Sequence, residues 1–166
     1  TGSHFTTLQM LEGALGRAHV AVTHGGLPQL RYAALRNRTC RAATVMEPFI
    51  SLGLKEGAHV IAAEFYRGGE VVAATLTPEE RSAYYAAENA AVDLINSDFY
   101  RFAHHVTAAT KGALAPNELL RAFVRYKHVD IYEAELFNRT YDWMKSWGLT
   151  PGRSEHIPRI IRSIST

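Results

Sequence analysis

Three short stretches of the sequence hold residues that could bind or transform a small polar molecule. Gly2-Ser3-His4, His24-Gly25-Gly26 and Glu47-Pro48 each combine a hydrogen-bonding side chain with glycine or proline. Glycine lets backbone N–H groups approach a ligand closely, and the first turn of a helix carries partial positive charge suited to an anion. The three stretches therefore predict a binding site for a carboxylate, sulfonate or phosphate group.

Two of these side chains also have ordinary structural explanations. Glu47 either caps the helix that begins at Pro48 or faces a cleft and receives a ligand's amine or hydroxyl. His24 either donates to a bound anion or is a polar residue at a rim. Both alternatives are open at this point.

The order of elements that would position these residues is read from apolar spacing. Helical spacing runs from Phe5 to Leu15, with Ser3 as its N-cap, and again from 27 to 35 and from 48 to 57. Continuous apolar runs at 20–23, 41–46 and 59–65 predict buried strands. The alternation predicts an α/β fold with a parallel sheet flanked by helices, in which ligands gather at the carboxyl ends of the strands.

Beyond a last β-like run at 70–76 the pattern is helical. Helices are expected from 77 to about 97, from 99 to 110, from 116 to 126 and from 132 to 147, where Gly148 stops the last one. We therefore predict two domains, an α/β ligand-binding lobe at 1–76 and a helical C-terminal segment at 77–166.

Composition restricts the class of protein. With 47% hydrophobic and 20% charged residues over 166 positions, the chain is typical of a globular protein with a core rather than a disordered or fibrous one. The net charge of +2 is spread along the chain, so nucleic acid is not an expected partner, and Arg31, Arg36, Arg38 and Arg41 are interpreted as a solvated helix face.

No cofactor or metal site is predicted. The single cysteine, Cys40, excludes a disulfide within the chain, and His104-His105 diverge by about 100° on a helix and cannot chelate one metal. No apolar stretch approaches the roughly 20 residues that span a bilayer, and the first residues do not read as a signal peptide.

Six segments resemble successive parts of the nitrate, sulfonate and taurine group of ABC-importer substrate-binding proteins. They are GSHFTTLQMLEGAL, VTHGGLPQLRYAAL, AATVMEPFISLGLKEGAHVIA, EFYRGGEV, AVDLINSD and TYDWMKSWGL. The resemblance implies the second of two lobes of a periplasmic-binding-protein-like fold, followed by its C-terminal helices. It implies ligand contacts at Gly2, Ser3, His4, His24, Gly25, Glu47, Tyr66 and Arg67.

The resemblance also suggests what the chain associates with and where it acts. A solute-binding component would hold a small organic anion in a cleft completed by a missing N-terminal lobe or a partner chain, and would deliver it to an ABC permease. The alternative is an enzyme on the same fold, of the pyrimidine synthase, desulfinase or lyase type, with His4, His24 and Glu47 as acid–base groups. A receptor would be periplasmic or extracellular and an enzyme cytoplasmic, and an incomplete apolar face predicts a possible homo-oligomer.

Overall fold

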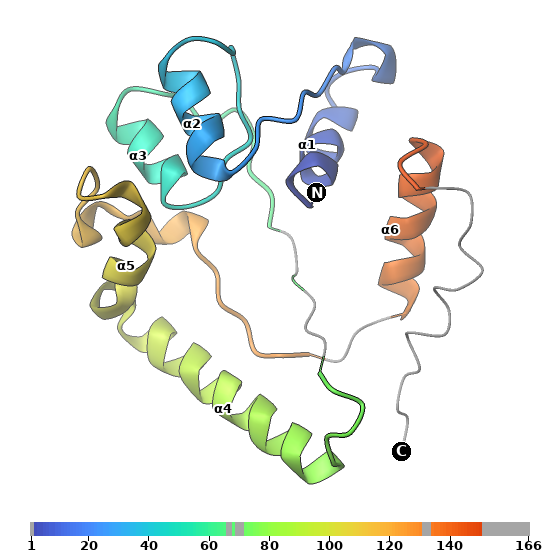
Figure 1. Cartoon of the computed structure of the whole chain (residues 1–166), viewed down its shortest axis with the longest axis vertical. Coiled ribbons are helices and arrows are strands. Elements are labelled where there is room, and N and C mark those ends of the chain that lie inside the picture. The colour runs from blue at the N-terminus through green and yellow to red at the C-terminus, as the bar shows by residue number, and fades with distance from the viewer. Residues whose placement is uncertain (1, 66–67, 69–71, 131–133, 151–166) are drawn as a thin grey trace. The chain divides into compact units, whose positions relative to one another are not determined.

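The computed structural model describes residues 2–65, 68, 72–130 and 134–150. Six α-helices and four short 3-10 helices lie in these residues. The α-helices are α1 (Gly2–Glu12), α2 (Pro28–Arg36), α3 (Phe49–Lys55), α4 (Pro78–Ser97), α5 (Phe99–Thr107) and α6 (Ala134–Ser146) (Figure 1). The 3-10 helices are η1 (Arg17–His19), η2 (Ala108–Thr110), η3 (Pro116–Glu118) and η4 (Arg121–Phe123).

The predicted α/β fold is wrong, because the described residues contain no β-strand. The runs at 20–23, 41–46 and 59–65 and the described part of 70–76 have no regular structure, and no parallel sheet flanked by helices is present among them. A strand is stable only when its N–H and C=O groups pair with a neighbour. Apolar, β-branched sequence supplies the tendency to extend but not that neighbour, so these runs remain coil.

Most of the predicted helices are confirmed, and their ends follow local chemistry. Helix α4 begins with a capping box in which Thr77 Oγ1 accepts from Glu80 N at 3.2 Å and a Glu80 oxygen accepts from Thr77 N at 2.8 Å. Helix α3 is followed by Gly57 at φ +89° and α6 by Gly148 at φ +66°, values that favour glycine.

Two helix predictions need correction. Helix α1 already includes Gly2, so Ser3 lies inside the helix and is not its N-cap. The helix expected from 116 to 126 is replaced by the single turns η3 and η4, whose ends at Leu119 and Val124 are extended and buried. Burial of apolar side chains therefore overrides the helical spacing there.

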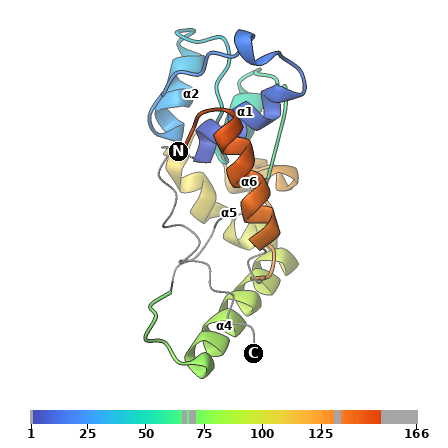
Figure 2. The same ribbon diagram turned by 90° about the vertical axis from the view of Figure 1, so that its right-hand side faces the viewer.

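The contacts divide the described residues into two compact units, one reaching up to residue 128 and the other covering 129–150. The first holds the hydrophobic core, formed by Tyr32 of α2, Phe49 and Leu52 of α3, Phe99 and Ala103 of α5, and Leu114, Leu119 and Val124. Figure 2 shows α4 extending away from these helices, and none of its residues is buried. The second unit consists mainly of α6, so the predicted boundary at residue 76 stays a prediction.

Candidate functional site

The turn before α2 is the predicted binding stretch with the most distinctive geometry. Gly26 has φ +74°, a left-handed conformation that other residues rarely adopt, and the chain then straightens at Leu27, the N-cap of α2. Pro28 occupies the first helical position, where the N–H that it lacks would have no partner within the helix. His24 and Gly25 are exposed, so the turn is open to a ligand.

Arg31 lies against this turn. A Cβ atom built on Gly25 would stand 2.8 Å from Arg31 Cγ, closer than real side chains approach one another. The Arg31 side chain therefore occupies the space that Gly25 leaves free. Arg31 is half-buried, which corrects its assignment to a solvated helix face, whereas Arg36, Arg38 and Arg41 are exposed.

The Arg31 guanidinium has an unsatisfied donor. Its Nε atom is buried and has no hydrogen-bond partner among the described residues. Leaving a buried donor unpaired costs on the order of 1–3 kcal/mol, and more when the group is charged.

The neighbouring cation on α2 behaves differently. Arg36 Nε lies 3.4 Å from Glu56 Oε2, and the same oxygen accepts from the Tyr32 hydroxyl at 2.6 Å. Burial, followed by the hydrogen bond to Glu56, raises the pKa of Tyr32 to about 12, so this hydroxyl stays protonated and donates. Arg36 thus has a counter-ion among the described residues, whereas the structure shows no ion pair for Arg31 within the same residues.

Glu47 takes the capping role. Its Oε2 accepts from Ser51 N at 3.0 Å and its Oε1 accepts from Ser51 Oγ at 2.7 Å, so the carboxylate holds an amide of the first turn of α3. Burial raises the pKa of Glu47, and the two bonds from Ser51 act in the opposite direction. Both carboxylate oxygens are in use, and a contact between Glu47 and a ligand stays a prediction.

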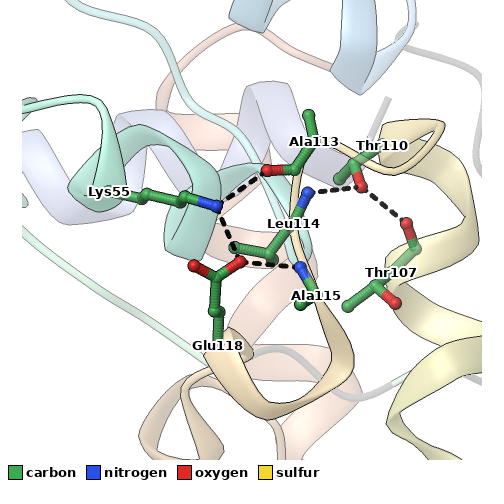
Figure 3. A network of polar contacts seen from close by, with 7 residues as sticks. All are labelled: Lys55, Thr107, Thr110, Ala113, Leu114, Ala115 and Glu118. Atoms are coloured by element: carbon green, nitrogen blue, oxygen red, sulfur yellow. Dashed lines mark hydrogen bonds and ion pairs between the residues drawn. The ribbon is translucent and has the colours of Figure 1, made fainter.

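Ser51 and Lys55 tie α3 to the segment that follows α5, a connection that sequence reasoning missed. Ser51 Oγ also accepts from Leu120 N at 2.9 Å, and Lys55 Nζ donates to Ala113 O at 3.1 Å and to Glu118 Oε2 at 2.7 Å. Figure 3 shows the Lys55 part of this network. Its members are about 60 residues apart in sequence, so no local spacing reveals them.

Thr110 and Glu118 add further hydrogen bonds in the same segment. Its Oγ1 donates to Thr107 O at 2.7 Å and accepts from Leu114 N at 3.2 Å, and Glu118 Oε2 accepts from Ala115 N at 2.7 Å (Figure 3). The hydrogen bond from Lys55 is the main reason that the pKa of Glu118 is lowered. These contacts hold the segment beside α3. Their polar groups are hydrogen-bonded to one another, so the network is not a candidate site.

Gly2, Ser3 and His4 lie in helix α1, and their contacts are mainly with other residues of that helix. The Ser3 carbonyl accepts from Thr7 Oγ1 at 2.6 Å, Thr7 is hydrogen-bonded to Thr44 at 2.6 Å, and the His4 ring packs edge-on against Phe5. Within the part of the chain that the structure describes, no hydrogen bond joins Gly2, Ser3 or His4 to His24, Gly25 or Glu47. Tyr66 and Arg67 lie outside the described residues.

The described residues contain neither a candidate metal site nor a helix that could span a membrane. They contain no group of three or more His, Cys, Asp or Glu side chains that could hold a metal ion. None of their helices combines the length and the apolar character needed to cross a bilayer. The turn at 24–26 with Arg31 is therefore the candidate site.

Comparisons of the chain with protein-family models, with curated proteins and with solved structures found no match. A functional assignment therefore depends on the sequence resemblance described above and on the geometry of the candidate site.

Proposed function

We propose that this chain is the solute-binding component of an ABC importer and that it recognises a small organic anion, such as a sulfonate, a carboxylate or a nitrogenous compound carrying one. Two observations support the proposal. The six segments that resemble nitrate, sulfonate and taurine receptors run from residue 2 to residue 149, and one of them contains the candidate site.

The second observation carries the proposal. An exposed turn with two glycines is packed against an arginine whose Nε has no partner among the described residues. Backbone that a ligand can approach closely, beside a cation that has no ion pair among the described residues, is suited to an anion. The site uses only the start of one helix and the turn before it, so it does not need a sheet.

The partners follow from the apolar surface of the first unit. Ile61 is 83% exposed, and Val60 and Phe65 beside it are also exposed. A contiguous exposed apolar stretch is typical of a surface that another polypeptide covers. We propose that another polypeptide covers this surface and that an ABC permease receives the ligand.

A thermal-shift screen of the purified chain tests this function. Taurine, methanesulfonate, nitrate and acetate would be compared with uncharged amides at constant ionic strength. We expect at least one anion to raise the melting temperature saturably, because a ligand at about 100 times its Kd stabilises the folded state by about 2.7 kcal/mol. If the uncharged compounds stabilise the chain as much as the anions do, or no compound does, the proposed function is wrong.

A further inference from the structure

We draw no further inference here: the strongest candidate, the exposed apolar stretch with Val60, Ile61 and Phe65 in the coil that follows α3, carries nothing further because nothing in the structure shows what covers it.

Discussion

Helix α3 and the segment that follows it are neighbours in sequence but opposites in environment. Phe49, Ser51, Leu52 and Gly53 of α3 are all buried, although the helix has only seven residues. Residues 59–65 are as apolar and richer in β-branched side chains, yet all of them are exposed. Hydrophobicity alone therefore does not decide which segment joins the core.

The difference lies in whether each segment can form its backbone hydrogen bonds by itself. An α-helix closes its own hydrogen bonds, and α3 needs help only at its ends, which Glu47 and Gly57 provide. A seven-residue helix would still be unstable alone, so its tertiary contacts through Ser51 and Lys55 are essential. Among the described residues the 59–65 segment pairs with no second strand, and apart from Arg125 packing over the Phe65 ring its apolar side chains are left in solvent.

The sharpest test of this contrast removes an apolar side chain from each environment. Leu119 is 0% exposed and packs in the core with α3 and α5, whereas Ile61 is 83% exposed. We expect Leu119→Ala to lower the free energy of unfolding by about 2–5 kcal/mol through lost burial and the cavity left behind. Ile61→Ala should change it by less than about 0.5 kcal/mol.

Urea denaturation followed by circular dichroism measures both variants. Similar losses in the two would show that residue 61 is buried in the folded protein, and the contrast between the segments would then be wrong.

The second test breaks the connection that holds α3 in place. Ser51→Ala leaves Leu120 N without its acceptor and takes one of the two donors from the Glu47 carboxylate. Ser51 is 3% exposed, so water cannot replace the hydroxyl readily, and we expect a loss of roughly 1–3 kcal/mol. Denaturation of the variant measures it.

Ser97→Ala serves as the control for this test. Ser97 Oγ also donates a hydrogen bond, to the Leu94 carbonyl, but the residue is exposed and water can take over the bond. A loss in Ser51→Ala no greater than in Ser97→Ala would contradict a supporting role for Ser51.

The same contrast explains which features were predictable from sequence. Helix ends set by local chemistry, such as the starts of α2 and α4 at residues 27 and 77 and the stop at Gly148 after α6, were predicted correctly because all the interacting groups lie within a few residues. The strands were wrong, because a strand depends on a distant partner that periodicity does not reveal.

The candidate site was predictable only in part. His24 and Gly25 were singled out from their residue types, and Glu47 was recognised as a possible cap. The packing of the Arg31 stem beside Gly25 was not visible, because it depends on how the turn and α2 fold together. Ser51, Lys55 and Glu118 were missed for the same reason, since their partners lie far along the chain.

The smallest expected effect concerns pH and compares the two carboxylates that contact α3. Burial raises the pKa of Glu47 in the folded chain, so the folded state binds this proton more tightly than the unfolded state does. Its contribution to stability is fully present below the unfolded pKa and is lost as the pH rises through the folded value. The pKa of Glu118 is lowered, chiefly by Lys55, so its contribution is present above the unfolded pKa and is lost as the pH falls through the folded value.

Stability measured from pH 3 to pH 7 for the unaltered chain, Glu47→Gln and Glu118→Gln distinguishes these two opposite pH dependences. The stability of the unaltered chain relative to Glu47→Gln should fall as the pH rises, whereas its stability relative to Glu118→Gln should increase. The Glu118 effect should also shrink in high salt, because that carboxylate and Lys55 are partly exposed to solvent, while the Glu47 effect should persist because burial causes it. Two curves of the same sign would mean that one carboxylate is not in the environment described here, and the salt dependence would identify which one.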